Sequence, residues 1–169
     1  MSILDEKEFF RFMLVNIANY QFGLPIGERL FPRNEIYFIF SKFFNRPKQI
    51  LNSHGEVIAT LDNATGTLLL HRAGARILHA ETTSPRFRVF VSDESFAFAR
   101  LGYNVFCKHV TSIDEDLRVG SEVLVVNNND ELAAVGKLMV PASAAKVLKK
   151  GVAVKVRWGL TPKTEIKHK

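Results

Sequence analysis

Hydrophobic residues in the first part of the chain recur with the period of a helix. Within residues 5–23, DEKEFFRFMLVNIANYQFG, the side chains of Phe9, Met13, Ile17 and Tyr20 repeat at intervals of three to four. This is the spacing of an amphipathic helix that buries one face. Asp5 and the acids just after it suit a helix start, and Gly23 suits a helix end. The pattern predicts a helix over this segment.

The next segments favour loops and strands. Residues 24–34 contain two prolines and a glycine and are predicted to form a loop. The aromatic and β-branched run at 35–44 is predicted to be a buried strand. Three short apolar runs between 48 and 72 are separated by SHG and NATG, which is typical of an antiparallel meander. A change to threonines and proline at 80–86 predicts the junction between two small α+β domains.

The second half alternates short strands with short helices. The cap residue Ser92 or Asp93 begins one helix, and Gly102 closes it in the left-handed conformation. The elements expected are a strand at 86–94, a helix at 93–102, strands at 103–110, 121–127 and 131–140, a helix at 141–151 and a strand at 152–159.

Two of these strands separate their side chains into faces, because successive residues of a strand point to opposite sides. In the last strand the packed face would carry Val152, Val154, Val156 and Trp158, and a basic face would carry Ala153, Lys155 and Arg157. In the strand at 103–110 one face would carry Tyr103, Val105, Cys107 and His109, and the other Asn104, Phe106, Lys108 and Val110.

The sequences FARLG, YNVFCKHV, DEDLRVGSEVLVVNNNDELAAVGKLMV and GVAVKVRWG follow one another over residues 86–159. In this order they resemble a PUA domain, a small pseudo-barrel found on RNA-modifying enzymes and ribosome-assembly proteins. The preceding NYQFGLPIGERLF and GEVIATLDNATGTLLLHRAGARIL are similar to the C-terminal accessory region of archaeal tRNA-guanine transglycosylase and archaeosine synthase. The segment SKFFNRPKQI departs from that pattern, which has a more basic, glycine-containing turn.

This resemblance implies an α+β protein. It places a small α+β accessory domain at residues 1–84, a PUA RNA-binding domain at 85–160 and a basic C-terminal tail at 161–169. The PUA part would be a mixed β pseudo-barrel with two short helices. In the transglycosylase such a pair of domains holds the tRNA while a separate barrel exchanges the base.

Charge favours a polyanionic partner. The 169 residues carry a net charge of +6, and residues 146–169 contain eight Lys or Arg against one acid, Glu165. Such a basic region attracts nucleic acid, because each neutralised phosphate releases counterions; a solubilising tail is the alternative. No apolar run is long enough to span a bilayer and the N-terminus lacks a secretory pattern, so we expect a cytoplasmic protein that binds no membrane.

Little in the sequence favours catalysis. Cys107 could act as a nucleophile with Lys108 and His109, but a lone cysteine between apolar residues is more typical of a core. The acids at 114–116 are expected to be solvated loop residues, and one cysteine excludes a multi-cysteine zinc site. The transglycosylase barrel and the synthase motif, a cysteine beside a proline, are missing. We therefore expect no catalytic residue, metal or cofactor.

The resemblance instead implies an RNA-binding surface. The matching positions are Arg100, Gly102, Tyr103, Asn104, Phe106, Lys108, Lys155 and Arg157. Cations would neutralise phosphate, the glycine would allow close approach and the aromatic rings would stack on bases; Tyr103 could instead be a core residue. The leading hypothesis is a non-catalytic tRNA-binding protein, stand-alone or a split accessory subunit of a tRNA-modifying enzyme of the archaeosine pathway. The alternative is a ribosome-biogenesis or translation factor that binds rRNA through the PUA domain and protein through the N-terminal domain.

Overall fold

The computed structural model describes residues 5–161, which fold as two compact units that divide between Glu81 and Thr82. All of the predicted basic tail at 161–169 except Thr161 lies outside the described residues. No helix of the described range combines the length and apolarity that crossing a membrane requires.

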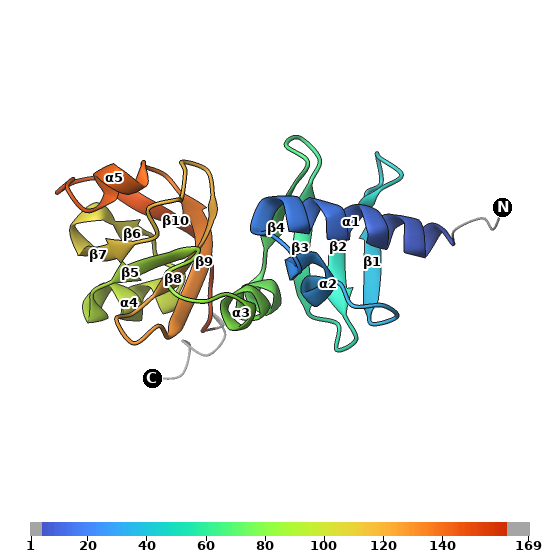
Figure 1. Ribbon diagram of the computed structural model, residues 1–169, viewed down its shortest axis with the longest axis horizontal. Coiled ribbons are helices and arrows are strands. Elements are labelled where there is room, and N and C mark those ends of the chain that lie inside the picture. Colours follow the sequence, from blue (N-terminus) through green and yellow to red (C-terminus); the bar gives the residue numbers. More distant parts are fainter. Residues whose placement is uncertain (1–4, 162–169) are drawn as a thin grey trace. The chain divides into compact units, whose positions relative to one another are not determined.

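The first unit is a four-stranded antiparallel sheet with helices packed against it (Figure 1). The predicted first helix is confirmed as α1 (Glu6–Phe22), and the Asp5 carboxylate accepts a hydrogen bond from the Lys7 amide. The predicted meander is also confirmed. The strands follow in the order β1 (Ile36–Phe40), β2 (Pro47–Asn52), β3 (Val57–Asp62) and β4 (Thr67–Leu70).

The apolar face predicted for α1 is wrong, because Phe9 and Tyr20 are 50% and 95% exposed, whereas Phe10, Leu14 and Ala18 are buried. Three further predictions for this unit are wrong or incomplete. The predicted loop at 24–34 contains helix α2 (Ile26–Leu30), because Ile26 and Leu30 are buried below α1 and stabilise a short helix despite the nearby prolines. The strand β1 is not buried. It is the edge of the sheet, and Tyr37 and Ile39 are about half exposed. The segment before the junction forms helix α3 (Arg72–Glu81), which the local pattern did not predict.

The second unit is a six-stranded mixed sheet that curls on itself. Its strands lie in the order β6-β10-β9-β8-β5-β7, and only the pair β5 and β8 is parallel. The two edge strands, β6 and β7, are joined by the three-residue turn η1 (Cys107–His109), so the edges approach and the barrel nearly closes. The strands are β5 (Arg88–Val91), β6 (Val105–Phe106), β7 (Val110–Ile113), β8 (Glu122–Val126), β9 (Leu132–Leu138) and β10 (Val152–Gly159).

With the helices α4 (Asp93–Arg100) and α5 (Ala142–Ala145), this confirms the predicted pseudo-barrel with two short helices. The predicted strand at 103–110 is wrong, because the chain turns through η1 from one sheet edge to the other. The helix predicted at 141–151 ends at Ala145. Val147 and Leu148 beyond it are exposed, so no buried face stabilises further turns.

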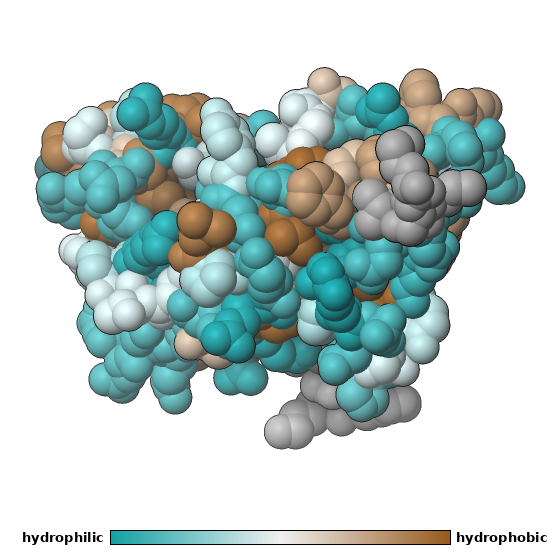
Figure 2. Space-filling view, turned by 45° about the vertical axis from the view of Figure 1, so that its right-hand side comes forward, coloured by the Kyte–Doolittle hydropathy of each residue, from teal (hydrophilic) through white to brown (hydrophobic). Residues whose placement is uncertain are grey.

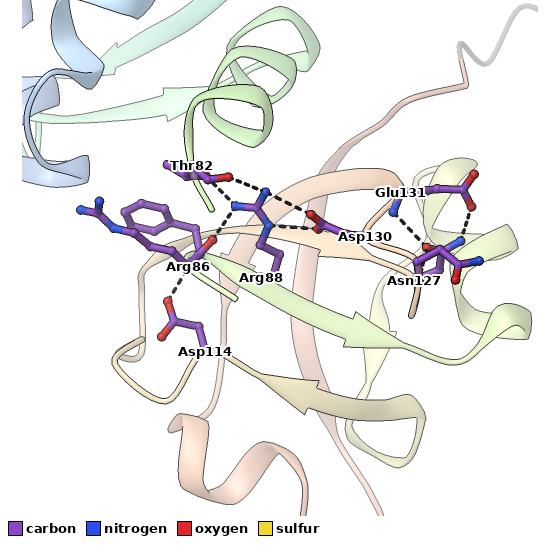
Figure 3. Close-up of polar contacts among 9 residues, drawn as sticks. Thr82, Arg86, Arg88, Asp114, Asn127, Asp130 and Glu131 are labelled. Carbon is purple, nitrogen blue, oxygen red and sulfur yellow. Dashed lines mark hydrogen bonds and ion pairs between the residues drawn. The ribbon is translucent and has the colours of Figure 1, made fainter. Parts of the chain in front are cut away.

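The core of the second unit is apolar, and one buried arginine lies beside it. Val89, Val91 and Val125 contribute to a continuous cluster of buried side chains. Arg88 is only 1% exposed, and its guanidinium contacts the Asp130 carboxylate at 3.0 Å and the Thr82 carbonyl at 2.9 Å (Figure 3). Because a buried charge is tolerated only when it is paired and hydrogen-bonded, this network is structural and ties Thr82 to the second unit.

Candidate nucleic-acid interface

The end of α4 presents a glycine turn with an exposed aromatic residue. Ser92 caps the start of the helix, and the Gly102 amide donates to the Ala99 carbonyl at its end. Gly102 has a φ of +95°, a conformation that favours glycine. The turn leaves Tyr103 61% exposed, with its ring edge-to-face on Phe98 at 5.8 Å. The alternative that Tyr103 is a core residue is therefore wrong.

This turn is attached directly to the last strand. A Cβ atom on Gly159 would lie 2.3 Å from the Arg100 carbonyl oxygen, so only glycine permits the contact. The Thr161 amide donates to the same carbonyl at 3.0 Å. Further along, the Asn104 side-chain oxygen accepts a hydrogen bond from the Val156 amide at 3.0 Å. The structure therefore brings Arg100, Gly102 and Asn104 beside β10.

Phe106 and Lys108 lie toward the other end of β10. Phe106 pairs with Val152 in the ladder, and the Cys107 amide donates to the Gly151 carbonyl. Phe106 is 48% exposed, and Lys108 is exposed on the η1 turn. Since a strand rises about 3.3 Å per residue, the candidate residues are spread along the length of β10 instead of converging on one point.

The cations of β10 differ in their surroundings. Lys155 is exposed and pairs directly across the ladder with Lys137 of β9, which is also exposed. Within residues 5–161 neither lysine forms an ion pair. Two like charges directly opposite each other are mutually unfavourable. A bound anion would relieve that repulsion, so Lys137 and Lys155 are suited to contact phosphate.

Arg157 instead holds a buried carboxylate. Its two terminal nitrogens contact the Glu122 oxygens at 2.8 and 2.6 Å, and the Glu122 side chain is only 4% exposed. This bidentate geometry is the strongest form of such a pair. The predicted two-faced strand is also wrong at Ala153, which is fully buried. Irregular register near both ends of β10 interrupts the simple alternation.

The residues considered for catalysis are buried or hydrogen-bonded within the fold. Cys107 is 2% exposed, and burial raises the pKa of its thiol, which keeps it protonated and unreactive at neutral pH. The His109 ring contacts the Ser92 hydroxyl at 3.2 Å. The prediction that Asp114 is solvated is wrong, because this residue is buried. Its carboxylate accepts hydrogen bonds from the Phe87 amide at 2.8 Å and from the Asp116 amide at 3.0 Å.

The six-stranded barrel, with its glycine turn beside β10, belongs to the PUA class. Residues 87–160 match the family model of the PUA domain. Residues 13–85 match the model of the patch-forming domain C2 of tRNA-guanine transglycosylase. The second unit is therefore a PUA domain, and a C2 domain of the transglycosylase type precedes it.

The similar proteins are archaeal. The chain is 39% identical over 155 residues to the tRNA-guanine(15) transglycosylase of Thermococcus kodakarensis, which is 92% of this chain and 26% of that protein. It is 39% identical over 145 residues to the enzyme of the same name from Methanocaldococcus jannaschii, covering 85% of this chain and 22% of the relative. The chain thus spans about a quarter of the length of these curated relatives.

Solved structures share the fold over almost the whole chain. A hypothetical protein from Pyrococcus horikoshii OT3 aligns with a TM-score of 0.70 at 19% identity, over 96% of both chains. A conserved PUA domain protein from Thermoplasma acidophilum aligns with a TM-score of 0.63 at 17% identity, over 95% of this chain and 94% of that one. At this level of identity the likeness shows the fold alone.

Proposed function

We propose that this chain is a non-catalytic module that binds structured RNA, specifically tRNA. It would serve as a stand-alone or split accessory subunit of a tRNA-modifying enzyme of the archaeosine pathway. The observation that carries the proposal is the match of both domains, in order, to proteins named tRNA-guanine(15) transglycosylase.

The surface along β10 supports an RNA ligand. Lys137 and Lys155 offer two positive charges without a carboxylate partner in the described part of the chain. Tyr103 and Phe106 expose aromatic rings on the segment that runs beside β10. Cations that contact phosphate fix the position of an RNA, and exposed rings stack on unpaired bases. Arg157 contributes by anchoring Glu122, which would otherwise compete with phosphate for the lysines.

The surroundings of the polar residues support a non-catalytic role. The one cysteine is buried with a raised pKa, and His109 contacts a helix cap. Within residues 5–161 no three His, Cys, Asp or Glu side chains gather as a metal site requires. Any base exchange would then require a separate catalytic part.

The test is equilibrium binding of a labelled tRNA transcript at several salt concentrations. We expect Lys155→Gln and Lys137→Gln each to weaken binding and to lower the slope of log K against log salt by up to about 0.9 for each phosphate that the lysine neutralises. Lys146→Gln is the matched control, since this exposed lysine of the same unit already pairs with Glu115 at 3.3 Å. It should change binding little.

Equal losses of affinity in all three variants would refute the assigned surface, because they would show a general effect of net charge. A preference for rRNA helices over tRNA would favour the ribosome-associated alternative. That alternative gains some support from the apolar surface of the first unit, where Phe12, Tyr20 and Leu24 are exposed; hydrophobic residues interrupt the hydrophilic surface in Figure 2.

A further inference from the structure

The loop between β1 and β2 exposes two neighbouring phenylalanine rings. Phe43 is 91% exposed and Phe44 is 56% exposed. The loop is nevertheless ordered by its own contacts, because the Ser41 hydroxyl accepts hydrogen bonds from both phenylalanine amides at 3.3 Å. The Ser41 amide in turn donates to the Arg46 carbonyl at 2.9 Å. The loop thus holds large apolar side chains in water at a defined place.

Phe44 forms one wall of a surface depression of about 490 Å³. Ala64 of the β3–β4 turn also lines it, together with Thr60 of β3 and Leu69 of β4. The depression is open to solvent, and its lining mixes apolar side chains with polar ones such as Lys48 and Thr60. A planar ring system could lie against Phe44 and above Leu69.

The depression and the β1–β2 loop beside it carry three cations. Lys48 lines it directly, and the adjoining loop adds Lys42 and Arg46 without any acid between residues 41 and 48. In the described residues none of the three cations forms an ion pair. Asp62, also in the lining, is occupied by the turn, since its oxygens accept from the Ala64 amide and the Thr65 hydroxyl. The depression and its loop therefore combine an exposed aromatic ring with an excess of positive charge, three cations against the one carboxylate of Asp62.

We propose that this depression binds an unpaired nucleotide, with the base stacked on Phe44 and the neighbouring phosphates at Lys48 and Arg46. The proposal deepens the function proposed above by assigning an RNA contact to the first unit. Charge complementarity favours RNA over an apolar protein segment, because stacking rings next to cations are the combination that recognises single-stranded nucleic acid. Phe44 and Lys48 line the same depression, and Arg46 lies between them in the sequence.

The test is fluorescence anisotropy of a 5′-fluorescein-labelled hexa-adenylate with the full chain. We expect Phe44→Ala to weaken binding roughly 5- to 150-fold, the range typical of removing one base–aromatic stack. Phe44→Leu should weaken it similarly, because leucine keeps the apolar volume but lacks a π-face. Phe43→Ala is the matched control and should change affinity less than about twofold. Lys48→Gln should lower the slope of log K against log salt concentration by up to about 0.7.

Three results would overturn the proposal: unchanged binding in Phe44→Ala, an equal loss of affinity in Phe43→Ala, or full binding by Phe44→Leu. Phe44→Trp keeps a stacking ring and should retain binding, which guards against a folding artefact of the smaller side chains. If Phe44→Trp is folded but loses as much affinity for hexa-adenylate as Phe44→Ala does, that result would also contradict stacking. Hexa-adenylate binding that depends on Phe44 without tRNA binding would refute the proposed function alone. tRNA binding that depends on Lys155 without any hexa-adenylate binding would refute this inference alone.

Discussion

Replacing Arg157 should lower the free energy of unfolding of the PUA domain, so its effect on RNA binding would not report a lost contact alone. The guanidinium holds both oxygens of Glu122 at 2.6 and 2.8 Å, and the Glu122 side chain is 4% exposed. Arg157→Ala removes this bidentate contact from a carboxylate that stays buried. Breaking a buried pair costs about 3–5 kcal/mol. Because the Arg157 side chain is itself 23% exposed, water can partly replace it, and we expect about 3 kcal/mol.

Urea unfolding measured by tryptophan fluorescence reports this destabilisation directly. Trp158 is the only tryptophan of the chain and lies in β10, next to the substituted residue. With a typical slope of about 1–3 kcal/mol per molar urea, the unfolding midpoint should fall by about 1–3 M. The control is the double variant Arg157→Ala with Glu122→Ala, which removes the stranded charge and should be more stable than Arg157→Ala alone.

A midpoint for Arg157→Ala within experimental error of the wild type would refute this reasoning. It would show that Glu122 is hydrated in solution and that Arg157 is available to phosphate. The result decides how binding data are interpreted, since a variant that combines Arg157→Ala with Lys155→Ala mixes unfolding with the loss of a proposed phosphate contact. Lys155 and Lys137, which form no ion pair in the described range, test the surface without this complication.

Two further predictions concern the backbone contact between Gly159 and Arg100 and the buried thiol of Cys107. Gly159→Ala would place a methyl group 2.3 Å from the Arg100 carbonyl, so it should lower the free energy of unfolding by roughly 1–3 kcal/mol and also weaken tRNA binding; unchanged values of both would contradict the contact. Cys107 should react with a disulfide reagent far more slowly in the folded protein than in urea, because burial raises its pKa. Stability should fall as the pH rises through the pKa of the unfolded thiol, since the unfolded chain then releases its proton first; rapid native labelling would contradict this.

Local sequence patterns predicted the elements that are stabilised by residues within their own sequence or bounded by clear turn residues. The helix α1 and the helix α4 carry caps and apolar periods within their own sequence, and the meander is marked by its turns. The helix α2 was missed because burial of Ile26 and Leu30 under α1 overrides two prolines. The η1 turn was missed because barrel closure joins two sheet edges, and no periodicity in YNVFCKHV indicates which edge each half must reach.

The same limit applies to the candidate RNA surface. The resemblance placed Lys155 and the Gly102 turn, both of which lie along β10. The partner Lys137 was missed because the register of two strands decides which residues face each other. Likewise Arg157 and Glu122 are 35 positions apart, and only the folded barrel joins them. Signals that depend on pairing across the sheet could not be obtained from one sequence without an alignment.

The glycine contact between β10 and the end of α4 also bears on the entropy of binding. Gly159 and Thr161 hold the strand against the Arg100 carbonyl, so the turn at Gly102 and the strand are joined before any ligand binds. The conformational freedom of this surface is given up during folding and not when a ligand arrives, and such preorganisation strengthens binding without adding a contact. The proposed RNA site in the PUA domain would thus owe part of its affinity to a residue that touches no RNA.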